Sequence, residues 1–205
     1  MTEKKTEKTP KASVMVDMKQ KIVESALVLA SEQGWEYTTL YDIAEHAELS
    51  MAELYDVLEH RDDVLVLLGR MIDKKVLSGL EAVKPDSTTS ARDRIFDVLM
   101  DRYDTLNDYR DGIISILDSF KYDPKQMVIA MPHLCRSMSW MLEGAGIETG
   151  GIKGAVKVTA MTGIYLKVLK SWTKDDSVDL SKTMSALDKA LERAETMANT
   201  FGFYN

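Results

Sequence analysis

Histidine and cysteine side chains are the first candidates for catalytic or metal chemistry in this chain, and their spacing argues against both. His46, His60 and His133 are far apart, and Cys135 is the single cysteine. Metal sites and nucleophilic centres need such groups at short spacings or beside a partner base. We therefore expect no enzyme, no catalytic residue, no metal and no cofactor. Cys135 lies in an apolar segment and is expected to be buried packing.

Carboxylates without counter-charges mark the segment 22–60. It holds nine aspartates and glutamates and no lysine or arginine, whereas residues 1–21 hold six lysines against three acids. Cations that displace the counterions of phosphates supply nearly all sequence-independent affinity for DNA. The charge of this segment therefore argues against ordinary DNA binding.

Methionines and aromatic residues of the C-terminal two thirds are the candidates for binding a small molecule. The chain has thirteen methionines, whose thioethers adapt to varied shapes. We expect an apolar pocket rather than a rigid core, although at any single position a core role is the simpler alternative. The predicted lining is Met100, Tyr103, Leu117, Phe120, Met127, Met131, Leu134, Met138, Trp140, Met141, Met161 and Tyr165. His133, Ser137 and Trp140 are the predicted polar contacts.

Helices must position all of these residues, because apolar positions recur at helical spacing and no alternating strand pattern occurs. The sequence therefore predicts an all-α fold. The expected helices cover about 16–33, 39–47, 51–59, a long segment from 61, 91–107, 112–121, 125–143, 151–172 and 180–200.

Two of the short helices have the sequence form of a helix-turn-helix. Gly34 is expected to stop the helix before them. Thr39 with Asp42, and Ser50 with Glu53, have the spacing of capping boxes, in which each side chain bonds the other residue's backbone N–H. The segment is therefore expected to form two short helices joined by a tight turn.

Length and composition suit one sizeable domain or a small module joined to a larger one. The 205 residues carry a net charge of −7 and are 45% hydrophobic. The single cysteine fits a reducing compartment, and no apolar run is long enough for a membrane span or a signal peptide. A cytoplasmic location is expected. Residues 1–15 are expected to be a disordered basic tail, either simply solvated or laid on DNA or an anionic lipid surface.

The segment Ile22–Asp73 resembles the TetR family of repressors. The carrying residues are Gly34, Thr38, Thr39, Asp42, Ile43, Ala44, Leu49, Ser50, Leu54, Tyr55, Asp63, Val64 and Leu65. The resemblance implies a TetR-like fold with a DNA-binding head over 16–61 and a helical ligand-binding and dimerisation body over 62–205. The last two helices, about 151–172 and 180–200, would pair two subunits in a four-helix bundle.

The same resemblance implies a set of DNA-contacting positions. They are Thr39, Ser50, Met51, Ala52, Glu53, Tyr55 and Arg61. Tyr55 matches an aromatic residue that often reaches a phosphate, and Arg61 stands where a backbone-binding lysine is common. The start of the recognition helix departs from the family, because Met51, Ala52 and Glu53 replace the usual lysine, glycine and threonine.

A second resemblance covers Trp140–Leu187, which is similar to the TetR-fold, lipid-binding accessory protein of ubiquinone biosynthesis. The residues that carry it are Trp140, Ala145, Gly146, Ile164, Tyr165, Asp175, Ser177, Asp179, Thr183 and Leu187. This resemblance implies a homodimer that encloses a prenyl lipid or related apolar molecule and no longer uses its head on DNA.

Periodicity supports the dimer independently. In the last helix an apolar stripe runs through Leu180, Met184, Leu187, Leu191, Ala194 and Met197, and Gly154, Ala155, Ala160 and Gly163 of the preceding helix allow close approach.

Together these observations predict a non-enzymatic homodimer that binds an apolar molecule, a prenyl lipid or quinone precursor, and presents it to a partner enzyme. Its acidic head would then be free to dock a protein. The alternative is a ligand-responsive TetR-type repressor that binds DNA.

Overall fold

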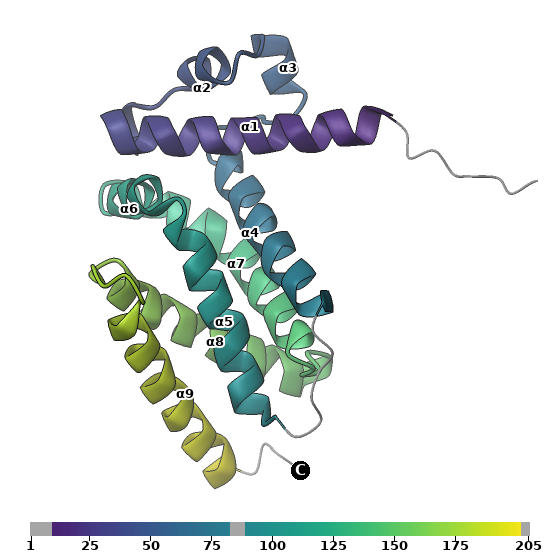
Figure 1. Ribbon diagram of the computed structural model, residues 1–205, viewed down its shortest axis with the longest axis vertical. Helices are drawn as coiled ribbons and strands as arrows, with labels where there is room; N and C mark the ends of the chain where they lie inside the picture. The colour runs from purple at the N-terminus through teal and green to yellow at the C-terminus, as the bar shows by residue number, and fades with distance from the viewer. Residues whose placement is uncertain (1–9, 83–88, 202–205) are drawn as a thin grey trace, which may run out of the picture. The chain divides into compact units, whose positions relative to one another are not determined.

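The computed structural model describes residues 10–82 and 89–201, and every regular element in them is a helix (Figure 1). This confirms the predicted all-α fold. The elements are α1 (Pro10–Gln33), η1 (Trp35–Tyr37), α2 (Leu40–His46), α3 (Met51–Tyr55), α4 (Asp63–Ala82), α5 (Ala91–Asn107), α6 (Arg110–Ser119), α7 (Pro124–Gly144), α8 (Gly151–Trp172) and α9 (Ser181–Phe201). Across the described residues, no helix has the length and apolar character that a membrane span requires.

The chain divides into two compact units. The first contains the residues up to Leu68 together with Asp111–Ser119, and the second contains Gly69–Arg110 and the residues from Phe120 on. The first unit therefore takes in 62–68 and 111–119 beyond the predicted head. Helix α1 begins at Pro10, so the end of the predicted tail is helical. The rest of that tail, residues 1–9, lies outside the described residues.

The first unit is built on α1, which packs against η1 and α2, while α2 packs against α3. The buried face of α1 has the predicted helical spacing: Ile22, Val23, Ala26, Leu27 and Ala30. Gly34 then ends the helix with a φ of 91°, which favours glycine. Burial of each large apolar side chain contributes roughly 1.5–3 kcal/mol, so this face supplies much of the stability of the unit.

Reciprocal caps begin both helices of the helix-turn-helix, as predicted. The Asp42 carboxylate accepts from the Thr39 N–H at 2.8 Å, and the Thr39 hydroxyl accepts from the Asp42 N–H at 3.2 Å. Ser50 and Glu53 repeat the arrangement at 2.9 and 3.2 Å. Helix α3 ends at Tyr55, earlier than predicted, and Glu48 in the turn adopts a positive φ of 56°. Local hydrogen bonds therefore define two very short helices.

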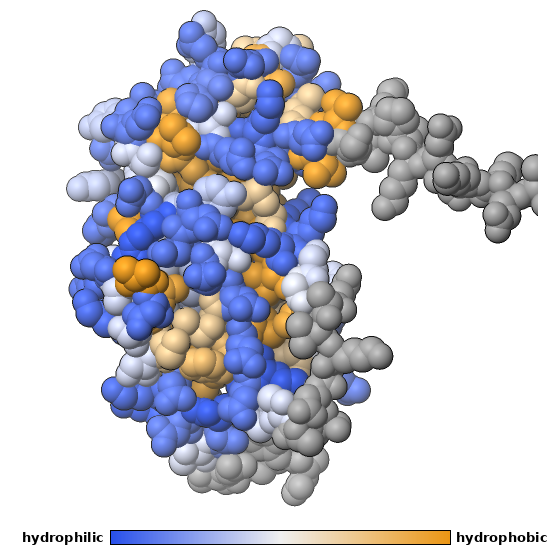
Figure 2. Space-filling model, viewed as in Figure 1, coloured by the Kyte–Doolittle hydropathy of each residue, from blue (hydrophilic) through white to orange (hydrophobic). Residues whose placement is uncertain are grey.

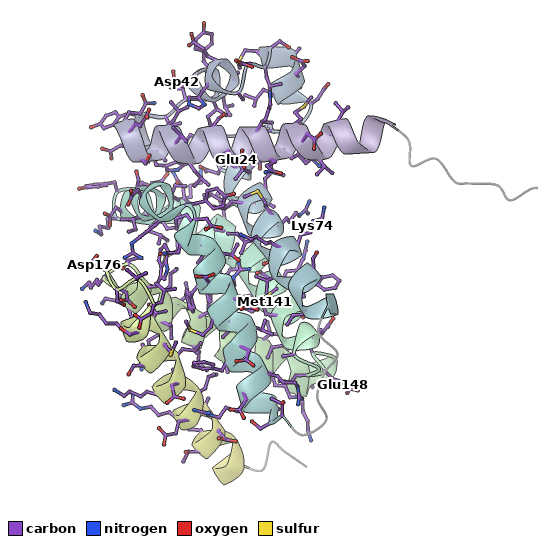
Figure 3. All side chains as sticks on the ribbon, viewed as in Figure 1. Glu24, Asp42, Lys74, Met141, Glu148 and Asp176 are labelled. Carbon is purple, nitrogen blue, oxygen red and sulfur yellow. The ribbon has the colours of Figure 1, made fainter. Side chains whose placement is uncertain are left out.

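Helix α5 is central to the second unit, where it packs against α7, α8 and α9. Val98, Leu99 and Tyr103 of α5 are buried, as are Met141 of α7, which Figure 3 labels, and Trp172 of α8. Helix α8 also packs along α9, and Figure 1 shows the two side by side.

Part of the apolar stripe of α9, which the sequence analysis assigned to the dimer interface, is buried within the same chain. Leu180, Leu187 and Leu191 are buried within their own chain, whereas Met184 and Met197 are exposed. The stripe was expected to face a second subunit, but its centre is already covered, because α5 and α8 both contact α9.

A buried aspartate holds the loop between α8 and α9. Asp175 accepts hydrogen bonds from the Thr183 N–H and hydroxyl, both at 2.7 Å, and from the N–H and hydroxyl of Ser177. Burial raises the pKa of Asp175, but these hydrogen bonds outweigh that effect and hold the pKa well below its usual range. Leu180, at a φ of 52° that is costly for a leucine, precedes α9 in the same loop.

Helix α6 approaches α1 so closely that only glycine fits at position 112. A Cβ there would overlap the backbone carbonyl of Leu27. We predict that Gly112→Ala lowers the free energy of unfolding by about 2 kcal/mol or more, as overpacking does. Urea denaturation measures this. The control is Gly79→Ala, because Gly79 lies inside α4 with open space around it, and its replacement is expected to be neutral or slightly stabilising. Equal effects of the two substitutions would contradict the close approach.

Asp175→Asn is predicted to cost about 2–3 kcal/mol of unfolding free energy at pH 7, because it removes a charged acceptor of four hydrogen bonds. The lowered pKa in the fold means that this contribution is complete above the unfolded pKa of about 3.9 and is lost as the pH falls below it. The difference from wild type should therefore shrink between about pH 4 and pH 2. Chemical denaturation at several pH values tests this, with the exposed neighbour variant Asp176→Asn as control. A difference that is constant with pH would contradict the assignment.

Candidate functional site

The surface of the helix-turn-helix presents six of the seven predicted DNA-contacting residues to solvent: Thr39, Ser50, Met51, Ala52, Glu53 and Tyr55. Tyr55 is 72% exposed and Tyr41 of α2 is 64% exposed, so both phenols are available as hydrogen-bond donors. Thr39, Ser50 and Glu53 are engaged in the caps of their own helices. Of the predicted DNA contacts, Met51, Ala52 and Tyr55 are therefore the exposed side chains that take no part in these caps.

Arg61, the seventh predicted DNA-contacting residue, is held inside the first unit. Its Nη1 donates to the backbone carbonyls of Trp35 at 2.8 Å, Thr38 at 2.9 Å and Glu36 at 3.3 Å. Its guanidinium also lies over the Trp35 ring, 4.8 Å from the centroid. Arg61 therefore caps the carbonyls at the end of η1 and covers a buried tryptophan, and its phosphate contact stays a prediction.

The charge of this surface is as acidic as the sequence indicates. Glu45, Glu48, Asp56 and Glu59 are exposed, and the stretch of sequence from Glu45 to Glu59 holds no lysine or arginine. The first unit is mostly hydrophilic in the view of Figure 2. The carboxylates of Asp42 and Glu53 have a structural role in the caps, and hydrogen bonds from Thr39 and Ser50 lower their pKa values. They remain charged and stabilise the helix starts.

The predicted pocket lining divides by burial. Tyr103, Met138, Met141, Met161 and Tyr165 are buried in the second unit, and Met100, Phe120, Met131 and Leu134 are partly buried. Leu117 belongs to the first unit. Met127 and Trp140 are about half exposed, and His133 is exposed, so these three face outward from α7. Helix α7 carries apolar residues on two faces, and only one of them is buried.

A small apolar space lies among the buried members of this set. Ile95, Val98, Leu99, Met141, Leu142 and Met161 line it. The space does not admit a water-sized sphere, so no ligand pocket is open among these side chains in this structure.

A polar cluster in the second unit joins Arg102 and Asp73, which sequence reasoning missed, to Ser137, a predicted polar contact. The Arg102 guanidinium pairs with Asp73 of α4, and the Ser137 hydroxyl donates to the same carboxylate oxygen at 2.6 Å. Arg102 is 3% exposed and lies over the Tyr165 ring, 5.3 Å from its centroid. An arginine in register with the buried Val98 and Leu99 of α5 was the available sequence signal.

Two tyrosines complete the cluster. Tyr103 and Tyr165 stack with their ring centroids 5.2 Å apart, and the Tyr103 hydroxyl donates to the Tyr165 carbonyl at 2.8 Å. Burial raises the pKa of Tyr103 well above its usual value, so its phenol stays protonated and keeps this bond at any physiological pH.

The described part of the chain contains no group of three or more His, Cys, Asp or Glu side chains arranged to hold a metal ion. Cys135 is partly buried, and the Thr162 hydroxyl lies 3.7 Å from its sulfur.

Comparisons with known proteins identify the fold. No family model and no curated protein matches the chain. Among solved structures, a TetR transcriptional regulator from Nitrosomonas europaea ATCC 19718 is similar with a TM-score of 0.70 at 24% identity, over 87% of this chain and 98% of that one. A TetR transcriptional regulator from Rhodococcus sp. RHA1 has a TM-score of 0.59 at 18% identity, over 86% and 94%. The chain therefore has the TetR fold. The resemblance to the ubiquinone accessory protein stays a prediction.

If Arg61 stabilises the fold, replacing it must lower the stability of the free protein in the absence of DNA. We predict that Arg61→Ala lowers the free energy of unfolding by about 2–3 kcal/mol, because three carbonyls and the Trp35 ring lose a cationic partner. The control is Arg70→Ala on the exposed side of α4, expected to stay within about 0.5 kcal/mol of wild type. Thermal or urea unfolding of the free protein measures both. An unchanged stability of Arg61→Ala would return Arg61 to the list of available DNA contacts.

Proposed function

We propose that this protein is a homodimeric, ligand-responsive transcriptional regulator of the TetR type. The observation that carries the proposal is the complete two-part fold, since a doubly capped helix-turn-helix and a helical body together match nearly the whole length of two transcriptional regulators. Such a head places a short helix on the major groove of DNA.

The exposed residues of α3 shape how this head would bind DNA. Met51, Ala52 and Tyr55 offer apolar contacts and a phenol, which suit thymine methyl groups and phosphate oxygens. With no lysine or arginine between residues 22 and 60 and with Arg61 engaged, few phosphates can be neutralised from this surface. We therefore expect low non-specific affinity and a shallow dependence of binding on salt.

The dimer in this proposal uses the outer faces of α8 and α9. Ile152 is 86% exposed, and Val156, Met184 and Met197 are also exposed, while Ala160 and Gly163 let a second helix come close. Four helices around a two-fold axis bury all of these at once.

A second function is favoured by the acidity of the head. A TetR-fold homodimer that binds an apolar molecule in its body and presents it to a partner enzyme needs no cations on α3. The resemblance to the ubiquinone accessory protein makes a prenyl lipid or quinone precursor the molecule in that case. The head would then be a protein-docking surface, since Glu45, Asp56 and Glu59 are exposed.

DNA selection with a charge-reversed variant separates the two functions. Wild type is expected to select discrete fragments from genomic DNA, including the region upstream of its own gene. Asp56→Lys combined with Glu59→Lys is predicted to raise affinity for those fragments at least tenfold and to steepen the salt slope by about 2, because two new cations reach phosphates. Fluorescence anisotropy across a salt series measures both.

The matched control is Asp97→Lys with Glu192→Lys, two exposed sites in the second unit, which makes the same change in net charge. It is expected to leave both quantities unchanged. If neither wild type nor the head variant selects a sequence, the regulator proposal fails. Mass spectrometry of an organic extract of the purified protein then tests the second function through the apolar molecule it should carry.

A further inference from the structure

The outer side of α7 exposes a run of apolar side chains that neither of the functions proposed above uses. The large apolar residues exposed on this helix and just before it are Tyr122, Met127, Val128, Ile129 and Trp140. Val128 is 73% exposed and Trp140 is 53% exposed. Successive exposed apolar residues are unfavourable in water unless another surface covers them. This side of α7 is therefore expected to have a partner.

Cations alternate with the apolar residues along this side of the helix. At spacings of three or four residues, one side of α7 carries Lys125, Ile129, Pro132, Arg136 and Trp140. All five are exposed. We call this row the outer face of α7. It is about 22 Å long, at 1.5 Å per residue, and therefore suits an extended surface better than a small ligand.

The outer face of α7 is positively charged, although the protein as a whole is acidic. No aspartate or glutamate occurs between Asp123 and Glu143, whereas the net charge of the chain is −7. The Asp123 carboxylate caps the helix, where it accepts from the Lys125 backbone N–H at 3.2 Å and from the Gln126 amide at 3.1 Å. Lys125 and Arg136 therefore give the face a charge that complements an anionic partner.

The order of residues along the face favours a lipid surface over a protein. Protein interfaces gather their apolar anchors at the centre and are depleted in lysine. Here Ile129 and Trp140 lie about three turns apart, with Arg136 between them. A helix that lies in the plane of a bilayer has this pattern, because its apolar and aromatic side chains enter the head-group region while its cations stay near the lipid phosphates.

We infer that the outer face of α7 binds the surface of an anionic lipid bilayer, with the helix lying along the surface and Trp140 among the head groups. Such binding needs no membrane-spanning helix, and the described residues contain none. The inference goes beyond the proposed function, because neither DNA binding nor ligand binding requires it. It places the second unit where apolar molecules are concentrated.

Trp140 makes a direct test possible, because the other two tryptophans, Trp35 and Trp172, are fully buried. The fluorescence of the full chain is recorded with vesicles of phosphatidylcholine alone and with vesicles of phosphatidylcholine and phosphatidylglycerol, about two parts to one. With the mixed vesicles only, the emission is expected to move to shorter wavelength and to be quenched by brominated acyl chains. An unchanged emission with the mixed vesicles, or an equal change with both kinds, overturns the inference.

A charge-removing variant assigns the binding to this face. Lys125→Gln with Arg136→Gln is expected to lower the partition coefficient for the mixed vesicles about thirtyfold in a flotation assay, since each cation near an anionic surface contributes roughly a fivefold factor. The matched control is Lys189→Gln with Arg193→Gln, which removes one lysine and one arginine from exposed positions of α9. It is expected to leave the partition coefficient unchanged. Equal losses in the two variants overturn the inference, because binding then follows the net charge of the protein.

An apolar variant separates a bilayer from other anionic partners. Val128→Gln with Ile129→Gln keeps every charge and is expected to lower the partition coefficient at least tenfold, because two apolar side chains no longer enter the head-group region. Circular dichroism checks that the variant remains helical, and the fluorescence of the wild type does not depend on it. If the charge-removing variant weakens DNA binding and the apolar variant changes neither DNA nor vesicle binding, the face binds nucleic acid and the inference is overturned. A protein that buries Trp140 while vesicles stay unbound overturns it as well.

Discussion

The buried ion pair between Arg102 and Asp73 is the interaction on which the second unit depends. Through it α5 is joined to α4, and Ser137 brings α7 to the same carboxylate. The Arg102 guanidinium then covers Tyr165 of α8. Apolar helices can slide along one another at little cost, whereas a charged pair shielded from water has one acceptable partner. The pair thus sets the register of four helices of the second unit.

The first unit contains two helices of only seven and five residues, which need stabilising interactions to stay folded. Isolated helices of this length are unstable in water. Caps from Thr39 with Asp42 and Ser50 with Glu53 satisfy their first N–H groups, and Arg61 satisfies the carbonyls of η1. Several charged groups that suggest a binding surface are therefore structural, and the remaining exposed carboxylates give the surface its acidic character.

Local interactions explain what could be predicted from the sequence. Helix starts at Thr39 and Ser50 were predictable because both partners of each cap lie three residues apart. The hydrogen bonds of Arg61 were not predictable, because its acceptors lie more than twenty positions earlier in the chain. Arg102 and Asp73 were missed for the same reason. Periodicity also failed to orient α7, since Trp140 and Met141 are adjacent apolar residues and only Met141 is buried.

The capping boxes have a consequence for how such a head can evolve. The carboxylates that hold α2 and α3 are internal to each helix, so the exposed side chains of Ala52 in α3 and of Asp56 and Glu59 after it take no part in these caps. Mutational drift at these positions changes the electrostatic potential of the head and leaves its folding intact. A lineage with this scaffold can therefore gain or lose affinity for a polyanion in a few substitutions, and its descendants need not share a partner.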